Sequence, residues 1–366
     1  MKIIFLDFDD YRNPLLGAGQ AKATLEVGSR LARRGHTIEV ITSRYPGSKN
    51  RIDNGIFYHH IGLGSNNIRL NNACYILCLP WYVTRLKGHI IIECFTAPIS
   101  TLFSQLFTSI PVVGLPTSFE ADRFSKLYKL PFDQIEKLGL KTYKYFLPYT
   151  KHFDNKIKRY NPKVLSKIVP EGVGDEFFSY PIKEPKHILF IGRYDIEQKG
   201  LDLLIKAYAK VANKIHYPLV IAGHGPDEMK MRALVGRLHM NDRITILGSA
   251  FGDKKKKLMS EALFIAFPSR HEGFSLFSLE ALASGHALAG FNIPGLSWAN
   301  NDISYKAKSF DIDEYALILK KLCNKTVAGR MGKKARVFAR KYTWNRVADL
   351  FETFFDHVLK IEESIL

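Results

Sequence analysis

Short apolar runs alternate with amphipathic stretches along this chain, and the alternation starts twice. The first series begins with an apolar run at residues 2–8, a glycine-bearing loop up to Gly19, and a helical stretch at 21–34. The second begins with an apolar run at 187–192 and a helical stretch at 200–211. Strands that alternate with helices favour βαβ units and parallel sheets. We therefore predict an α/β protein with two such arrays in tandem.

The remaining runs continue both arrays. Apolar runs rich in β-branched residues predict further strands at residues 37–42, 56–61, 89–93 and 111–115, and at 217–222, 243–247 and 263–267. Apolar or amphipathic stretches predict helices at residues 74–86, 99–107, 132–147, 327–341 and 344–361.

The length of 366 residues also favours two domains, because a single core rarely grows beyond about 250–300 residues. The stretch between the two arrays contains Pro181 and Pro185 and is predicted to be a linker. The predicted domain organisation is an N-terminal domain at 1–171, the linker at 172–186, a C-terminal domain at 187–343 and a closing helix at 344–366.

Composition limits the location of the protein. No apolar run reaches the roughly 18–20 residues that a membrane-spanning helix needs. Asp7 and its acidic neighbours interrupt the N-terminal apolar run, which argues against a signal peptide. The four cysteines show no paired metal spacing and no disulfide framework. We expect a cytoplasmic protein.

The charge is unevenly distributed. The net charge is +18, and residues 122–167 carry twelve Lys or Arg against four Asp or Glu, while residues 320–346 carry ten and no acid. Such faces favour an anionic membrane surface, a phosphate-bearing substrate or nucleic acid. Signatures of nucleic-acid-binding modules are absent, so nucleic acid is not an expected partner.

Aromatic residues are interleaved with the basic residues of 122–167. These aromatics either form one buried helix face, which includes Phe132, Tyr143, Phe146 and Leu147, or rest on an anionic bilayer. We expect peripheral association with the inner face of a membrane.

Three features follow predicted strands of the second array, where open α/β sheets bind their ligands. Arg193 and Lys199 flank a helix start and suit a diphosphate, since guanidinium and helix amides both bind phosphate oxygens. Gly223 and Gly225 allow backbone to approach a ligand closely. The third feature is the segment 268–280.

Two acids bracket a predicted helix start in that segment. Glu272 precedes the helix, and Glu280 lies one to two turns inside it, facing a cleft where its carboxylate suits a vicinal diol. Alone, these acids are better explained as a helix-capping group and a solvent-facing group. Together with the two cations they predict a ligand site.

The combined motifs resemble a known family. Gly192-Arg193 with Lys199-Gly200, then Gly223-x-Gly225, then two glutamates at 272 and 280, resemble the retaining GT-B-fold glycosyltransferases of family four, also called glycosyl transferases group 1. Residues 111–116 and 342–348 also fit the family. The resemblance implies two Rossmann-like domains facing each other across a cleft, with the C-terminal helix returning to the N-terminal domain.

The resemblance also implies roles for matched positions. Arg193 and Lys199 bind the donor diphosphate, Glu280 holds the ribose hydroxyls and Glu272 is the catalytic residue beside the sugar. Further donor contacts are expected at Gly19, Gly223, Gly225, Gly273, Phe274, Ser275 and Leu276.

The implied reaction moves a hexose-type sugar, with retention and without a metal or cofactor, from a UDP- or GDP-sugar. The basic and aromatic face of residues 122–167 in the N-terminal domain predicts a lipid-linked or cell-envelope glycan as the acceptor, bound by that domain. A soluble acceptor is the alternative.

Some positions depart from the family pattern. The place where many relatives carry a histidine close to the sugar is nearest to Thr117, beside Ser118. The second residue after Gly273 is Ser275 where the family has glycine, and residues 293–297 lack an expected acid. Two other functions share the architecture: a sugar-nucleotide 2-epimerase and a non-catalytic sugar-nucleotide binder.

Other charged runs give weaker hypotheses. Asp7 and Asp9 have the spacing of an aspartyl-nucleophile phosphatase, but no later lysine and acidic pair follow in the right context. Asp311 and Asp313 could be a metal-binding pair, although helix capping explains them better. The four lysines at 254–257 are expected on a solvated helix.

Overall fold

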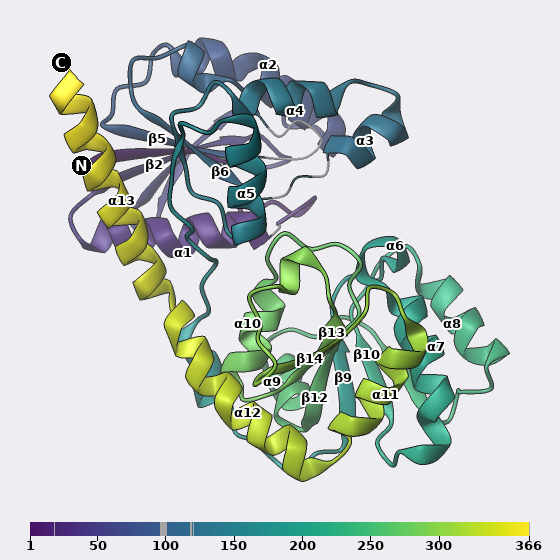
Figure 1. Ribbon diagram of the computed structural model, residues 1–366. Coiled ribbons are helices and arrows are strands. Elements are labelled where there is room, and N and C mark those ends of the chain that lie inside the picture. Colours follow the sequence, from purple (N-terminus) through teal and green to yellow (C-terminus); the bar gives the residue numbers. More distant parts are fainter. Residues whose placement is uncertain (18, 96–100, 118, 120, 366) are drawn as a thin grey trace. The chain divides into compact units, whose positions relative to one another are not determined.

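The computed structural model of the chain describes residues 1–17, 19–95, 101–117, 119 and 121–365. The chain divides into two compact units. Unit 1 comprises residues 1–171 and 344–366, and unit 2 comprises residues 172–343. In Figure 1 each unit is a central sheet flanked by helices.

Unit 1 is built on a mostly parallel sheet with the strand order β3-β4-β2-β1-β5-β6-β7-β8. Its strands are β1 (Lys2–Leu6), β2 (Thr37–Ser43), β3 (Arg51–Asp53), β4 (Ile56–Ile61), β5 (Ile90–Phe95), β6 (Val112–Pro116), β7 (Tyr145–Phe146) and β8 (Leu165–Ser166). β3 is antiparallel to β4, and β1 pairs in parallel with β2 and β5. β5 is buried along its whole length, as expected for parallel strands covered on both faces.

Helices cover this sheet. They are α1 (Gly19–Arg33), α2 (Ile68–Val83), α3 (Ala121–Tyr128), α4 (Phe132–Leu140), α5 (Lys151–Tyr160) and α13 (Trp344–Ile365). The last helix joins unit 1 by burying Phe351, Phe355 and Val358. Arg34 contacts Asp349 and Glu352 of this helix, at 2.6 Å each.

Unit 2 has a parallel sheet with the strand order β11-β10-β9-β12-β13-β14. Its strands are β9 (His187–Ile191), β10 (Leu219–Ala222), β11 (Ile244–Leu247), β12 (Ala262–Phe267), β13 (Leu288–Phe291) and β14 (Ser304–Ala307). Its helices are α6 (Ile196–Lys199), α7 (Leu201–Val211), α8 (Glu228–Arg237), α9 (Gly252–Ser260), α10 (Leu276–Ala283), α11 (Ile312–Leu322) and α12 (Lys325–Ala339). The strand order changes direction between β9 and β12, which is where such sheets bind ligands.

The predicted α/β class with parallel sheets is confirmed. Two predicted helices are wrong in part. Of the helix expected at 99–107, residues 99 and 100 lie outside the described residues, and only a short 3-10 turn, Ser104–Leu106, forms in the rest. The helix expected at 132–147 ends at Leu140, where the Asn161 amide donates to the carbonyls of Leu140 and Tyr143. The aromatic residues that follow the end of this helix, Tyr145 and Phe146, form β7 instead.

The stretch at 172–186 packs within unit 2. Val173 forms a bridge with Thr343 and donates its backbone N–H to the Tyr342 carbonyl at 2.7 Å. Lys183 and Lys186 donate backbone hydrogen bonds to the chain just before β12. Among the described helices, none has both the length and the apolarity needed to cross a bilayer.

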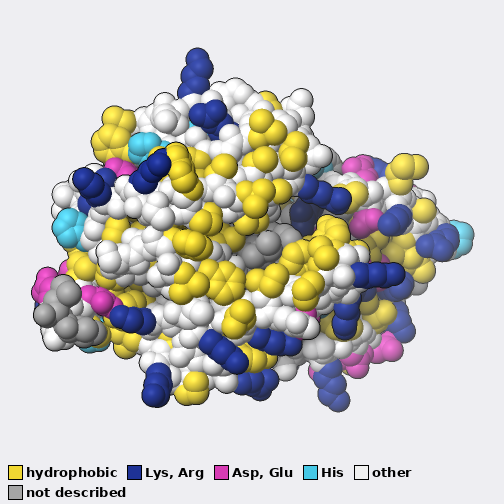
Figure 2. Space-filling view, turned by 90° about the horizontal axis from the view of Figure 1, so that it is seen from above, with side chains coloured by type: hydrophobic (Ala, Val, Ile, Leu, Met, Phe, Trp, Pro, Cys, Tyr) yellow, Lys and Arg dark blue, Asp and Glu magenta, His cyan; other side chains and the backbone are white. Residues whose placement is uncertain are grey.

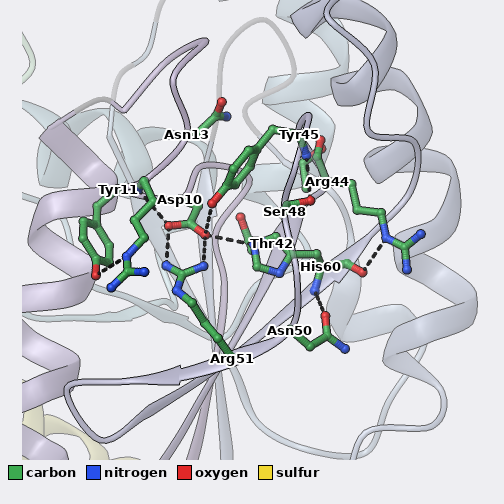
Figure 3. A network of polar contacts seen from close by, with 12 residues as sticks. Asp10, Tyr11, Asn13, Thr42, Arg44, Tyr45, Ser48, Asn50, Arg51 and His60 are labelled. Carbon is green, nitrogen blue, oxygen red and sulfur yellow. Dashed lines mark hydrogen bonds and ion pairs between the residues drawn. The ribbon is translucent and has the colours of Figure 1, made fainter.

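A buried acidic cluster follows β1. Asp10 accepts hydrogen bonds from both terminal nitrogens of Arg51, at 2.7 and 2.8 Å, and pairs with His60 Nε2 at 2.9 Å (Figure 3). Burial alone raises the pKa of Asp10, but the hydrogen bonds from Arg51 and His60 outweigh it and hold the pKa below its usual value. The acids after β1 therefore have a structural explanation.

Asp7 behaves in the opposite way. Its carboxyl group accepts a hydrogen bond from Thr24 at 2.5 Å and is 1% exposed. Burial is the main cause that raises its pKa from 3.8 to about 7, and the Thr24 bond only partly offsets it. Folding thus favours the protonated form of Asp7. The stability that the fold has with protonated Asp7 is fully present below pH 3.8 and is lost as the pH rises towards 7, where the carboxyl group ionises.

Asp7→Asn should remove this pH dependence, because the amide stays neutral. We expect the melting temperature of the variant, relative to wild type, to rise by several degrees between about pH 5 and about pH 8. Thermal unfolding at the two pH values measures it, with Asp356→Asn on the exposed face of α13 as the control. A difference that does not change with pH would contradict the assignment.

Candidate functional site

The predicted ligand-binding loops follow the central strands of unit 2. Arg193 and Lys199 follow β9, Gly223 and Gly225 follow β10, and the segment 268–275 follows β12. β9 pairs in parallel with both β10 and β12, so the carboxyl ends of all three strands lie at the same edge of the sheet. The three predicted features therefore lie together in the structure.

A short ion pair joins the first and third of these loops. Lys199 Nζ lies 2.5 Å from Glu272 Oε1, and the Ser269 hydroxyl donates to the same oxygen at 2.8 Å. The Glu272 side chain is only 7% exposed. Charge-assisted hydrogen bonds of this kind fix a carboxylate in place, so Glu272 has a defined position at the strand ends.

The backbone around this pair is closely packed. A Cβ on Gly295 would lie 2.3 Å from the backbone oxygen of Glu272, and one on Gly200 would lie 2.1 Å from that of Pro268. Gly200 also has a φ of +63°, which side chains rarely adopt. Arg270 donates hydrogen bonds to both carboxylate oxygens of Asp202, at 2.8 and 2.9 Å. These contacts hold the loop after β12 against α6 and α7.

Arg193 is a more accessible cation. Its side chain is 57% exposed, donates to Gln198 Oε1 at 2.6 Å and lies 3.4 Å from Asp195. Asp195 in turn caps α6 by accepting from the Gln198 backbone N–H at 2.9 Å. The guanidinium is thus oriented by its neighbours while most of it remains open to a ligand.

Gly223 and Gly225 have a packing role in the structure. A Cβ on Gly223 would lie 1.8 Å from the Gly192 oxygen, and one on Gly225 would lie 2.4 Å from the Tyr194 oxygen. Both positions therefore exclude a side chain because the loop after β9 passes over them. Their contact with a ligand stays a prediction.

The helix start after Gly273 is capped and packed by its own side chains. Ser275 caps α10 by accepting from the Ser278 backbone N–H at 3.3 Å. Phe274 is buried and stacks on Trp298, with ring centroids 4.9 Å apart. Gly273 and Leu276 are partly exposed at the same turn. The backbone amides of this turn are the ones predicted to contact the nucleotide-sugar donor.

Glu280 has a partner that sequence reasoning missed. The residue is 8% exposed, and Lys255 Nζ lies 2.5 Å from its Oε2. Lys255 comes from α9 and also lies 5.0 Å from the ring of Phe177. Neither acid of the pair 272 and 280 is a simple surface group, and the ligand contacts predicted for both stay predictions.

The lysine run that contains Lys255 needs a correction. The helix is present and the other three lysines are exposed, but the Lys255 side chain is only 19% exposed because it reaches across to Glu280 of α10. Nothing in the spacing of four consecutive lysines identifies which one points inward. Asp311 does cap α11, by accepting from the Glu314 backbone N–H at 3.0 Å.

The remaining predicted positions belong to unit 1. Gly19 is the first residue of α1. The Thr117 hydroxyl, just after β6, donates to the Phe95 carbonyl at 2.6 Å. Ser118 lies outside the described residues. Among the described residues, no group of three or more His, Cys, Asp or Glu side chains is arranged to hold a metal ion.

Comparison with known proteins finds a family match within unit 2. Residues 174–338 match the family model described as Glycosyl transferases group 1. The chain is 22% identical over 383 residues to N-acetyl-alpha-D-glucosaminyl L-malate synthase of Bacillus anthracis, an alignment that covers 96% of this chain and 97% of that protein.

A second relative aligns only in part. It is N-acetylgalactosamine-N,N'-diacetylbacillosaminyl-diphospho-undecaprenol 4-alpha-N-acetylgalactosaminyltransferase of Campylobacter jejuni, 35% identical over 118 residues. That alignment covers 32% of this chain and 31% of the relative, so the chain spans less than a third of the length of that relative.

The fold extends over the whole chain. The structure matches sucrose-phosphate synthase from Thermosynechococcus elongatus with a TM-score of 0.80 and 16% identity, covering 99% of this chain and all of that one. The family match in unit 2 and this full-length likeness agree with each other. The chain therefore has the GT-B fold, and its residues 174–338 match glycosyl transferases group 1.

Proposed function

We propose that the protein transfers a hexose-type sugar, with retention and without a metal, from a nucleotide diphosphate donor to a lipid-linked or cell-envelope glycan. The observation that supports this best is the contact of Lys199 with Glu272, which lie 73 residues apart in the sequence. It brings a cation suited to phosphate to a buried carboxylate, and the exposed Arg193 lies in the same segment after β9 as this cation.

The charges fit the demands of glycosyl transfer. When the bond between the anomeric carbon and the diphosphate breaks, the electron pair and the negative charge stay on the leaving diphosphate. Cations held in advance at that place, such as Arg193 and Lys199, stabilise the transition state. The negative carboxylate of Glu272 would stabilise the positive charge that develops on the sugar ring in the transition state.

Glu280 is proposed to hold the ribose of the donor. A carboxylate accepts hydrogen bonds from two neighbouring hydroxyl groups, and burial of Glu280 on α10 fixes its direction. Lys255 occupies one of its oxygens in the structure. Donor binding at this position thus requires that the carboxylate share or exchange its lysine contact.

Observations favour two acceptor classes. The name of the Campylobacter relative includes a diphospho-undecaprenol acceptor, which fits a lipid-linked acceptor and a basic protein at a membrane. The name of the Bacillus anthracis relative includes L-malate, which fits the alternative of a soluble acceptor. We place the lipid-linked acceptor first because the net charge of +18 favours an anionic surface.

A screen of UDP-, GDP- and dTDP-sugars for thermal stabilisation tests the donor site. We expect one nucleotide class to raise the melting temperature of wild type, and Glu280→Ala to abolish that rise because the ribose contact is lost. Glu184→Ala, which removes an exposed ion-paired acid of the same unit, should keep it. A rise that survives in Glu280→Ala would rule out the ribose role.

Glu272→Gln tests the catalytic role. The amide can still accept from Ser269, so the loop should keep its shape, but the negative charge is gone. We expect kcat to fall about 100-fold or more, while donor-induced stabilisation persists. An unchanged kcat would argue against the role.

The same assay separates the rival activities. Incubation with the sugar nucleotide alone should give no epimer, because the proposed reaction needs an acceptor. Formation of an epimer without acceptor would identify a 2-epimerase instead, and tight binding without transfer or hydrolysis would identify a binder.

A further inference from the structure

A short segment after β13 contacts the loop that carries Glu272. This segment, residues 294–298, begins as a 3-10 turn and is called the 294–298 turn below. A Cβ on Gly295 would lie 2.3 Å from the backbone oxygen of Glu272, so the two backbones are in close contact. The Trp298 ring stacks on Phe274 with an angle of 13° between the ring planes. The 294–298 turn therefore contacts the loop after β12 at two points.

One side chain connects these two contacts. Nε1 of the Trp298 indole donates to the Gly295 carbonyl at 2.9 Å, while the face of the same indole lies on Phe274, with ring centroids 4.9 Å apart. The Leu296 N–H donates to the Ile293 carbonyl at 3.0 Å and closes the turn. Trp298 thus fixes the position of both contacts relative to each other.

Aromatic residues at the end of α12 support this indole. The Phe338 ring stacks on Trp298, with centroids 6.2 Å apart and an angle of 18°, and the Tyr342 ring lies 5.7 Å from Trp298. The Tyr342 carbonyl accepts the Val173 backbone N–H at 2.7 Å. Phe274 of the loop after β12 is thereby connected, through Trp298, to the end of α12 and the first residues of unit 2.

The backbone position of Glu272 decides where its carboxylate lies. Lys199 and Ser269 fix the direction of the side chain, but the backbone that carries it is packed against Gly295. Catalytic groups act over short distances, and a displacement of about 1 Å can lower a rate about 100-fold. The contact at Gly295 leaves no room for a side chain, and residues 293–297 are the segment that lacks an acid expected from the family pattern. The chain thus departs from that pattern where it packs against its proposed catalytic residue.

We infer that Trp298 is a positioning residue, which holds Glu272 in place for the transfer step through Gly295 and Phe274. The inference rests on the proposed catalytic role of Glu272 and adds to it a residue that acts through others. The 294–298 turn belongs to the site in this sense, although none of its side chains is predicted to contact the donor.

Trp298→Leu tests the inference, because it removes both the ring stacking and the indole hydrogen bond. We expect kcat to fall about 10-fold or more, while the KM for the nucleotide sugar changes less than about 2-fold because the diphosphate and ribose contacts remain. Trp298→Phe keeps a ring on Phe274 and should recover part of the loss. Tyr305→Leu is the control, since Tyr305 is also a partly exposed ring of unit 2, on β14; it should leave kcat unchanged.

Gly295→Ala tests the backbone contact directly. Its new Cβ would press on the Glu272 backbone, so we expect a fall in kcat of about 10-fold or more, again with little change in KM. Gly329→Ala on α12 is the matched control, because no other described residue outside its own helix backbone and chain neighbours comes within 4 Å of the added Cβ. It should leave both constants unchanged.

A double-mutant cycle separates positioning from a general structural role. With Glu272→Gln in place no carboxylate remains to be positioned, so adding Trp298→Leu should lower kcat less than about 2-fold further. A purely structural residue would lower kcat by the same factor in both backgrounds. Thermal unfolding gives a second cycle that needs no activity. There the two substitutions together should lower the melting temperature by less than the sum of their separate shifts, because Trp298 supports the pair of Lys199 and Glu272.

All these substitutions lie in unit 2. Figure 2 views the protein from the side where α2 of unit 1 lies in Figure 1, and it shows hydrophobic side chains over this face with Lys and Arg among them. The α2 side chains are the same in every variant. Differences in kcat between the variants therefore do not arise from a changed contact of α2 with an acceptor.

Three outcomes would overturn the inference. The first is an unchanged kcat in Trp298→Leu while Glu272→Gln lowers it, and the second is an equal loss of kcat from Trp298→Leu in both backgrounds. The third is a set of strictly additive shifts in the melting temperature. An unchanged kcat in Glu272→Gln would instead contradict the proposed function, and the unfolding cycle would still show whether Trp298 positions Glu272.

Discussion

Parallel strand pairing is the constraint on which the rest of this structure depends. In a parallel sheet all carboxyl ends lie at one edge, so loops that are distant in sequence meet there. β9 lies between β10 and β12, and this position brings Lys199 within 2.5 Å of Glu272. The same rule operates in unit 1, where Arg44 follows β2 and His60 lies near the end of β4. Each unit thus gathers its polar side chains at the strand ends.

The sequence predicted the elements that have strong local signals. The strand at 56–61 has the predicted bounds, and β9 and β12 differ from prediction by one residue at one end. These runs are long, apolar and rich in β-branched or aromatic residues. β13 and β14 were not predicted, because segments such as Leu-Ala-Gly-Phe at 288–291 have little intrinsic strand preference and become strands through burial between neighbours.

Site residues that depend on long-range contacts could not be predicted from the sequence, for the same reason. The motif spacing identified Arg193, Lys199, Glu272 and Glu280, because each follows a recognisable strand or helix start. Lys255 was missed because its role depends on α9 lying next to α10, which no local pattern encodes. The structure adds a steric reason for Gly223 and Gly225 in the neighbouring loop, and their contact with a ligand stays a prediction.

The path of the chain has a consequence for synthesis. Unit 2 is an insertion in unit 1, and its two ends lie side by side because Val173 forms a bridge with Thr343. Chains fold in part as they leave the ribosome, and domains fold as units. Unit 2 is therefore complete while unit 1 still lacks α13, which buries Phe351 and Phe355. The domain that starts first along the chain is the one that finishes last, and until then its core stays open to solvent or to a chaperone.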